Sequence, residues 1–351
     1  MRQESETHSQ AGQKSGHKVI NLALQGGGSH GAFAWGALDR ILEDERIVIE
    51  GIVGTSAGAM NAAVTAYGLT CGGNAGARQA LARFWKAVAD VGAWSIIQPS
   101  ALDRLISPGS LDYSPGWVLM DMLSRVWSPY QMNPANYNPL REILENQIDF
   151  DTLSRSDKVK LFVCASNVFT NRLRVFDLSD ISVDGVIASA CIPSVFQAVE
   201  IDGEFYWDGG YMGNPPIFPI IYNSVSTDVL LIMVNPIHIE EVPNSAQAIL
   251  DRINTLSFNS SLMREMRAIN FVNRLVESGF DDGGRLKRML IHCIDAEDEM
   301  SRLGVSSKLN VSRDFLTWLF ELGRERADVF LRDHFDTLGK SSSTSIEQRF
   351  L

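Results

Sequence analysis

The sequence predicts an α/β fold in which helices flank a central, mostly parallel sheet. Two segments carry this prediction, because each consists of a short apolar run, a glycine turn and a helical pattern. The first joins residues 19–24 to 31–44, and the second joins 47–53 to 57–67. Strands that alternate with helices are typical of a parallel sheet with both faces covered. A further apolar run, 229–234, has the composition of a strand buried on both sides.

The composition is that of a folded, acidic protein. The 351 residues are 45% hydrophobic, which is enough for a large core. Lysine and arginine number 31 and aspartate and glutamate 42, so the net charge is −11. Because this balance opposes binding to a phosphate backbone, and no dense basic run is present, we expect no nucleic-acid partner. The four cysteines show no Cys-x-x-Cys spacing, so we expect free thiols and a cytoplasmic location.

The chain divides into one folded domain and two polar ends. Residues 1–18 lack an apolar stretch, so we expect a disordered N-terminal arm rather than a signal peptide. Residues 336–351 are serine-rich and are expected to form a polar C-terminal tail. The domain at 19–335 contains one uncharged stretch, 51–77, that is long enough for a membrane span. Its glycine and alanine content instead predicts a buried helix packed closely on a sheet.

The remaining elements follow from hydrophobic periodicity and turn residues. Short apolar runs predict strands, and apolar residues three or four positions apart predict helices. The sharpest turn signal is Asp202-Gly203, which lies between two runs that we expect to form a hairpin. The predicted strands lie at 160–166, 172–176, 196–201, 204–207 and 289–294, and the predicted helices at 78–90, 183–190 and 245–278.

A long segment at 91–139 interrupts this pattern. It is rich in proline and serine, and it shows no regular period. Two interpretations remain open: a lid or binding loop, or a satellite cluster packed on the main core. Its large side chains include Trp94, Trp117, Met120, Met122, Trp127, Tyr130 and Met132.

The strongest local signal for chemistry is Gly54-Thr55-Ser56-Ala57-Gly58. It lies between a predicted strand and a predicted helix, which is the context that the G-x-S-x-G nucleophile elbow requires. A sharp turn exposes the serine hydroxyl, and the glycines permit close approach of neighbouring strands. Ser56 would also lie at a helix N-terminus, where developing negative charge is stabilised. We interpret Ser56 as a nucleophile, and a structural glycine turn is the alternative.

A second glycine turn, GGGSHG at 26–31, also lies between a strand and a helix. It contains the G-x-G-x-x-G spacing of dinucleotide-binding loops, so a non-catalytic nucleotide-binding module is one interpretation. That site requires an acidic residue at the end of the second strand, whereas the nearest acid, Glu50, precedes the strand end. The other interpretation is an oxyanion hole formed by the backbone N–H groups of Gly26, Gly27 and Gly28.

The base that would activate Ser56 has two candidates. Asp208 precedes two glycines at a predicted strand end, where it could act as the base. The alternative is an ordinary Asp-Gly turn with no catalytic role. A triad of the α/β-hydrolase type, in a carboxylesterase, would need a histidine that follows the serine. Only His238, His292 and His334 follow Ser56. His334 is near the tail and His292 lies inside a predicted strand, whereas His238 is possible by position although no feature singles it out.

Together and in this order, these motifs resemble those of the patatin-like phospholipase family, in a bacterial-type lipid acyl hydrolase. The resemblance includes the segment Ser-Ala-Cys-Ile-Pro at 189–193 and extends over 21–216. It implies a three-layer fold with a single catalytic domain that cleaves fatty-acyl esters of phospholipids or lysophospholipids. Ser56 would be the nucleophile and Asp208 the base of a dyad, with Gly26 to Gly28 as the oxyanion hole. The resemblance implies no catalytic histidine, no metal and no organic cofactor.

One residue departs from the family pattern. Many members carry a cation where this chain has His30, which makes His30 a candidate head-group contact. A histidine is largely neutral near pH 7, so anchoring of a phosphate there is in doubt. We expect a lipid or membrane-surface substrate and peripheral, hydrophobic rather than polybasic, contact with a membrane. A catalytically silent scaffold of the same fold is the remaining alternative, and the sequence leaves the oligomeric state open.

Overall fold

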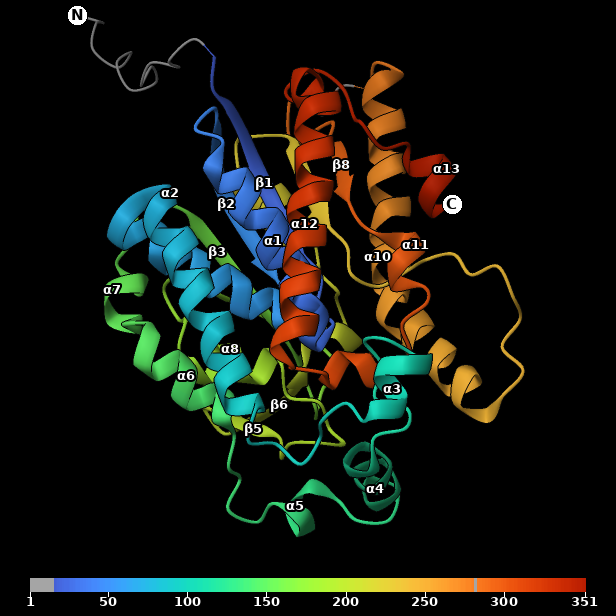
Figure 1. Ribbon diagram of the computed structural model, residues 1–351. Coiled ribbons are helices and arrows are strands. Elements are labelled where there is room, and N and C mark those ends of the chain that lie inside the picture. Colours follow the sequence, from blue (N-terminus) through green and yellow to red (C-terminus); the bar gives the residue numbers. More distant parts are fainter. Residues whose placement is uncertain (1–15, 281–282) are drawn as a thin grey trace, which may run out of the picture.

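The computed structural model describes residues 16–280 and 283–351 and places one mixed sheet at the centre of the molecule (Figure 1). In this part of the chain the sheet has eight strands, in the order β5-β6-β3-β2-β1-β7-β8, with β4 paired to β3. The predicted, mostly parallel α/β sheet is confirmed. The parallel strands are β1 (Lys18–Leu24), β2 (Ile47–Gly54), β3 (Lys160–Asn167), β7 (Asp228–Ile232) and β8 (Leu290–Ile294). The antiparallel strands are β4 (Leu173–Asp177), β5 (Val199–Ile201) and β6 (Glu204–Asp208).

Two strands share one edge of β3, and this sharing positions the site. β4 pairs with residues 162–166 of β3 and occupies the opposite edge. On the shared edge, β2 pairs with the first half of β3, where Gly54 is opposite Val163. β6 pairs with the second half, where Asp208 is opposite Ala165. The end of β6 therefore lies beside the turn that follows β2.

Helices cover both faces of the sheet and give three layers (Figure 1). Leu22 and Leu24 of β1 belong to the core on one face, which α1, α2 and α12 cover. Ala23 belongs to the core on the other face, which α9, α10 and α13 cover. This alternation explains why β1 is apolar at every buried position except Asn21, whose side chain donates to the Ser226 carbonyl. The helices of the two faces are α1 (Gly31–Glu43), α2 (Ala57–Gly92) and α12 (Arg313–His334), and α9 (Phe218–Asn223), α10 (Ala246–Glu277) and α13 (Ile346–Phe350).

Residues 51–54 of the uncharged segment complete β2, and residues 57–77 form the first part of α2, which is buried as far as Ala66. Its alanines lie on the sheet, and Gly58 approaches the Leu24 carbonyl so closely that a side chain there would collide with it. The helices predicted at 57–67 and 78–90 are both present within the range of α2, and non-helical backbone at Gly72 and Gly73 separates them. Among the described helices, none is both long and apolar enough to cross a membrane.

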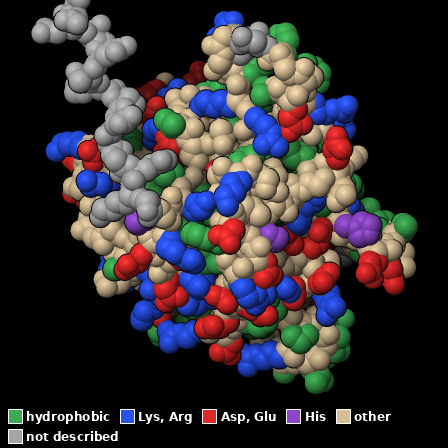
Figure 2. Space-filling view, turned by 90° about the horizontal axis from the view of Figure 1, so that it is seen from above, with side chains coloured by type: hydrophobic (Ala, Val, Ile, Leu, Met, Phe, Trp, Pro, Cys, Tyr) green, Lys and Arg blue, Asp and Glu red, His purple; other side chains and the backbone are tan. Residues whose placement is uncertain are grey.

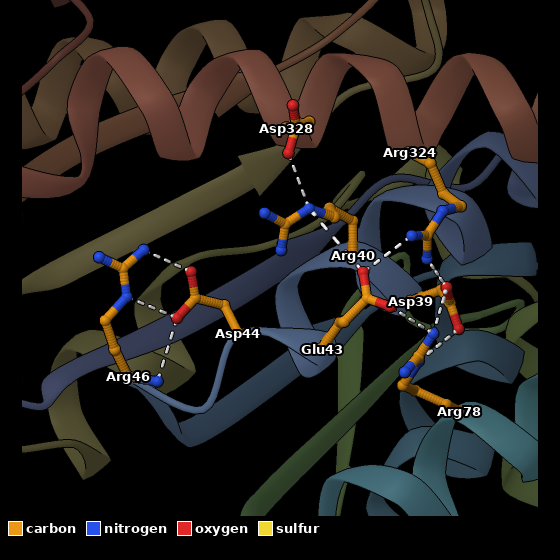
Figure 3. A network of polar contacts seen from close by, with 8 residues as sticks. All are labelled: Asp39, Arg40, Glu43, Asp44, Arg46, Arg78, Arg324 and Asp328. Atoms are coloured by element: carbon orange, nitrogen blue, oxygen red, sulfur yellow. Dashed lines mark hydrogen bonds and ion pairs between the residues drawn. The ribbon is translucent and has the colours of Figure 1, made fainter.

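The C-terminal helix α12 packs unusually closely on α1. A side-chain carbon at Gly36 would collide with the Phe320 carbonyl, and one at Gly323 would collide with the Phe33 carbonyl. An ion network continues this contact (Figure 3), in which the buried Asp39 carboxylate binds both Arg78 of α2 and Arg324 of α12. Arg78 and Arg324 also bind Glu43, at 3.0 and 2.8 Å. The network ties three helices together around one carboxylate.

The two ends of the chain differ from the expected arm and tail. Residues 1–15 of the expected arm lie outside the described residues, and β1 already begins at Lys18. The expected polar tail at 336–351 is wrong, because Ile346 and Phe350 of α13 are buried against the α10 face. Ser342 Oγ accepts the Ile291 N–H at 3.0 Å. The serines therefore supply hydrogen bonds to the edge strand β8, a use that composition does not reveal.

The irregular segment contains short helices joined by loops at the lower end of the molecule (Figure 1). Ser100 and Ser114 accept backbone N–H groups at the starts of two of them, and proline follows Ser114 at the first helical position. Such one- and two-turn helices escape a periodicity search because they are too short. They are α3 (Ala101–Ile106), α4 (Pro115–Ser124) and α5 (Pro129–Met132), and they precede α6 (Pro139–Gln147), α7 (Phe150–Ser154) and α8 (Val183–Ser189).

Candidate active site

Ser56 lies on a strained turn between β2 and α2. Its backbone has φ 56° and ψ −125°, a conformation that residues other than glycine rarely adopt. Gly54 and Gly58 are the reason that the turn closes, because Gly54 would meet the Gly58 carbonyl if it carried a side chain. The Ser56 N–H donates to Ser189 Oγ of α8 at 2.9 Å. The predicted strand–turn–helix context of the elbow is confirmed.

Asp208 ends β6 and is 1% exposed. Its Oδ1 accepts the Gly210 N–H at 2.7 Å, and its own N–H donates to the Cys191 carbonyl at 2.8 Å. Burial raises the pKa of Asp208 to about 6, against the lowering effects of the Gly210 N–H, the Ser56 hydroxyl and the Lys308 charge. Its Oδ2 has no hydrogen-bond partner among the described residues.

Ser56 and Asp208 are thus brought together although 152 residues separate them in the chain. The pairing of β2 and β6 to the same edge of β3 accounts for their proximity. The segment after α8 fixes both, since Ser189 binds the Ser56 backbone and Cys191 binds the Asp208 backbone. Catalytic hydrogen bonds often tighten only when substrate binds, and the unpartnered Oδ2 is available to the Ser56 hydroxyl.

The first glycine turn lies directly opposite Ser56, but only part of it is free. Gly27 and Gly28 line a cavity together with Ser56 and Asp208. The Gly26 N–H donates to Asn214 Oδ1 at 2.7 Å, and the Gly26 carbonyl accepts Asn235 Nδ2 at 2.7 Å. The assignment of Gly26 as an oxyanion donor is therefore wrong, because its N–H is already used. Gly26 instead anchors the turn.

His30 does not face the cavity. It is 2% exposed, its Nε2 lies 2.7 Å from Ser307 Oγ, and its ring meets Phe315 edge-on. Burial, with the nearby charge of Lys308, lowers its pKa to about 3, so the ring is neutral. The expectation of a head-group contact at His30 is wrong, because its side chain points into the core.

A cation that sequence reasoning missed, Lys308, nevertheless lines the cavity. Lys308 belongs to η3 (Val305–Leu309), which follows α11 (Glu297–Met300) and lies far outside the motif region. It lines the cavity beside Gly28 and Ser56. Burial lowers the pKa of Lys308 to about 8, while Asp251 and Asp208 raise it. An isolated lysine in a polar stretch carries no local pattern that would have identified it.

Two cavities meet at Ser56, Gly28 and Lys308. The inner cavity has a volume of about 170 Å³ and is lined almost entirely by apolar side chains, among them Met60, Phe84 and Trp85. The outer cavity has a volume of about 400 Å³ and carries polar groups. Residues of the irregular segment line the outer cavity, which favours a binding role for part of that segment. These residues are Ile97, Trp117, Met120, Asp121, Ser124 and Arg125.

The histidines considered for a triad lie away from Ser56. His292 of β8 bonds to Asp228 at 3.0 Å and to Ser343 at 2.9 Å, at the end of the sheet where the parallel strands begin. His334 ends α12 and packs on Phe330. The N–H of His238 donates to Glu297, and neither cavity at Ser56 is lined by a histidine.

The nucleotide interpretation also lacks its partner residue. Glu50 binds Lys160 at 2.8 Å and accepts the N–H groups of Val225 and Ser226, so its carboxylate is fully engaged. The Lys308 carbonyl closely approaches Gly28, on the turn that would receive a pyrophosphate. Among the described residues, no cluster of three histidine, cysteine, aspartate or glutamate side chains could hold a metal ion.

Comparison with known proteins agrees with the motif pattern. The family model for patatin-like phospholipase matches residues 22–221. Among solved structures, the chain is similar to VipD from Legionella pneumophila, with 16% identity and a TM-score of 0.43 over 93% of this chain and 70% of that one. It is also similar to ExoU in the ExoU–SpcU complex of the type III secretion system of Pseudomonas aeruginosa, with 17% identity and a TM-score of 0.36 over 90% of this chain and 52% of that one. A second structure of ExoU gives 14% identity and a TM-score of 0.34 over 90% of this chain and 53% of that one.

The chain therefore spans about half the length of the ExoU chains that it matches. A search of curated proteins found no match. The family model covers more than half of the chain and includes both glycine turns, Ser56 and Asp208. The chain belongs to the patatin-like phospholipase family.

Proposed function

We propose that the protein is a serine-dependent lipid acyl hydrolase in which Ser56 and Asp208 form the catalytic dyad. One observation carries the proposal: the strained Ser56 and the unpartnered oxygen of the buried Asp208 lie where an apolar cavity opens into one that also carries charged side chains. An acyl ester has the same division, with an apolar chain on one side of the carbonyl and a polar alcohol on the other.

The first half of the reaction forms an acyl-enzyme. Asp208 takes the proton of the Ser56 hydroxyl while Oγ attacks the ester carbonyl. The N–H groups of Gly27 and Gly28 stabilise the oxyanion that results. When the intermediate collapses, the C–O bond to the alcohol breaks, and Asp208 returns its proton to the leaving alkoxide. The alcohol, a lysophospholipid or glycerophosphodiester, leaves through the outer cavity.

Water completes the cycle. Asp208 takes a proton from a water molecule, whose oxygen attacks the acyl-Ser56 carbonyl. The second tetrahedral intermediate collapses with return of that proton to Ser56 Oγ, and the fatty acid leaves. Each proton that Asp208 accepts is given back within the same half-reaction, so neither a metal ion nor a redox partner enters the balance.

The surface around the outer cavity supports a lipid surface as the source of substrate. Trp94 is 92% and Val126 is 77% exposed, and both belong to the irregular segment that lines the cavity. The opposite end of the molecule, where β1 begins, is covered by interspersed charged side chains (Figure 2). Exposed apolar groups gathered at a site mouth mark an interaction surface. Contact with lipid would therefore be made through the irregular segment.

A fluorophosphonate probe with mass mapping tests the dyad, because it labels only an activated serine. We expect label on Ser56 in the wild type, its loss in Asp208→Asn, and its retention in His238→Gln as the matched control. Loss of label in His238→Gln would favour a triad. A folded wild type without label would contradict the proposed function.

A further inference from the structure

Lys308 is built into the catalytic centre by a part of the chain that the family model does not match. The model ends at residue 221, and η3 lies 84 residues further on. The Lys308 carbonyl accepts the Ser29 hydroxyl at 2.9 Å and lies against Gly28. Ser306 Oγ, in the same turn, accepts the Leu111 N–H at 2.9 Å. These contacts fix η3 between the glycine turn and the irregular segment.

The ammonium group of Lys308 lies between Asn235 and Phe258, and Phe258 lines the outer cavity. Nζ donates to Asn235 Oδ1 at 2.8 Å and lies 5.8 Å from the centre of the Phe258 ring. An ammonium carries three donors, and Asn235 accepts one of them. The side chain is half-buried, and it lines both the inner and the outer cavity beside Ser56. A cation in this place can reach a ligand bound next to the reacting ester.

The outer cavity carries several carboxylates, so binding of an anionic ligand there depends on the positive charge of Lys308. Asp121, Asp208 and Asp251 line the cavity, and only Arg125 and Lys308 of its described lining residues offset them. Of these two cations, Lys308 is the one that also lines the inner cavity with Ser56. His30 is neutral and faces away. Without Lys308, the carboxylates would repel an anionic group close to the ester.

We propose that Lys308 determines specificity by binding the phosphate of a glycerophospholipid whose ester is presented to Ser56. This inference rests on the proposed function and names the substrate class for that site. In glycerophospholipids the phosphate is carried on the same glycerol backbone as the scissile esters, so it necessarily binds close to Ser56. Lysine binds phosphate as a point charge and tolerates variation in its orientation.

The test compares Lys308→Met with Lys158→Met, an exposed lysine that lines neither cavity. Each protein is assayed on a phosphatidylcholine and on a diacylglycerol with the same chains, in the same mixed micelles. A hydrogen bond to a charged group contributes about 1.5–3 kcal/mol, so we expect kcat/KM on the phospholipid to fall about 10- to 100-fold in Lys308→Met. On the diacylglycerol kcat/KM should fall clearly less, because there only the loss of the Lys308 charge beside Asp208 is felt. Lys308→Arg should keep most of the preference for phosphate.

Inorganic phosphate distinguishes the lipid phosphate from a free anion. It should inhibit hydrolysis of a soluble neutral ester by the wild type weakly, and less in Lys308→Met. Equal losses of kcat/KM on both lipids would overturn the proposal, because Lys308 would then only hold the glycine turn through Asn235. Unchanged activity on both would overturn it as well.

A binding measurement separates this inference from the proposed function. Calorimetry in the Ser56→Ala background uses a short-chain phosphatidylcholine and the corresponding diacylglycerol below their micellar concentrations. Weaker binding of the phospholipid alone, when Lys308→Met is added, would support the phosphate site even if the wild type hydrolysed neither lipid. Equal binding with and without Lys308 would overturn it even if the wild type were an active hydrolase.

Discussion

Asp208 would be a weak base at the ordinary pKa of aspartate, and its burial changes this. A proton acceptor works best when its pKa lies near the working pH. Removal of Asp208 from water moves its pKa from 3.8 to about 6, which brings it closer to neutrality. The Gly210 N–H and the charge of Lys308 oppose the shift, so the carboxylate remains ionised at pH 7. The fold therefore keeps a charged group buried beside Ser56, where the proposed dyad requires a base.

This arrangement has a stability cost that depends on pH. The pKa of Asp208 is higher in the folded state than in the unfolded state. Its contribution to the free energy of unfolding is therefore fully present below about pH 3.8 and is lost as the pH rises through about 6. Above that pH, the shift corresponds to about 3 kcal/mol of lost stability. We predict that Asp208→Asn is increasingly more stable than the wild type as the pH rises from 4 to 7. Urea unfolding at three pH values measures the difference.

One control variant and one unchanged residue support this comparison. Asp157→Asn, at a 90% exposed carboxylate, should show no such trend. Glu265, whose pKa burial raises to about 7, is present in every variant, so its own pH dependence cancels in the comparison. A constant difference between Asp208→Asn and the wild type across these pH values would contradict the assignment of a buried, ionising base.

At the scale of elements, the sequence predicted those features that depend on neighbours in the chain. The strand–turn–helix segments around Ser56 and the turn at Asp202-Gly203 follow from local patterns, and both are confirmed. The occupied N–H of Gly26 depends on Asn214, and the burial of His30 depends on Ser307. Such contacts form between segments that are distant in the chain, so no local sequence pattern predicts them.

The C-terminal end of the chain and Lys308 also depend on contacts between segments that are distant in sequence. Ile346 and Phe350 are separated by polar residues and show too short a pattern to predict a packed helix. Their burial depends on the face of α10, which is distant in sequence. Lys308 likewise becomes a candidate site residue only when the fold places it beside Gly28. The sequence alone therefore indicated Ser56 and Asp208, the two residues of the proposed dyad, but not the cation next to them.

The crossing of α1 and α12 provides a prediction at this scale. We expect Gly323→Ala to destabilise the protein by about 2–4 kcal/mol, because its new methyl group would overlap the Phe33 carbonyl and push the helices apart. Since η3 directly precedes α12, the variant should also lose preference for the phospholipid over the diacylglycerol. Thermal unfolding and the two lipid assays measure these effects.

Glu321→Ala is the matched control on the same helix, since Glu321 is exposed and alanine favours a helix. It should leave both the unfolding temperature and the lipid preference near the wild-type values. A Gly323→Ala protein that is as stable as Glu321→Ala would show that the two helices do not cross as closely as the structure has them.

At the scale of the whole molecule, the two ends of the sheet have different surfaces. The strand carboxyl ends carry Ser56, the cavities and the exposed apolar side chains of the irregular segment. The strand amino ends carry charged groups (Figure 2). This polarity gives the molecule one orientation in which the cavity mouth meets a lipid surface and the charged end remains in water.

We predict that Val126→Ser lowers activity on phospholipid vesicles several-fold and leaves activity on a soluble short-chain ester unchanged. Removal of exposed apolar area weakens attachment to the lipid surface but does not touch the cavity. Val225→Ser is the matched control, because Val225 is 85% exposed and lies just before β7, at the charged end. Equal losses on vesicles and on the soluble ester would contradict the membrane role.

The position of β1 in the sheet also limits how this enzyme could be shortened or recombined. β1 lies between β2 and β7, and β7 begins after the last residue of the family match. A fragment that ended there would leave one edge of the mostly apolar strand β1 unpaired and would lose α10, α12 and α13. Such an edge recruits other chains. The part that contains Ser56 and Asp208 is therefore smaller than the part that can be inherited, expressed or exchanged as a unit.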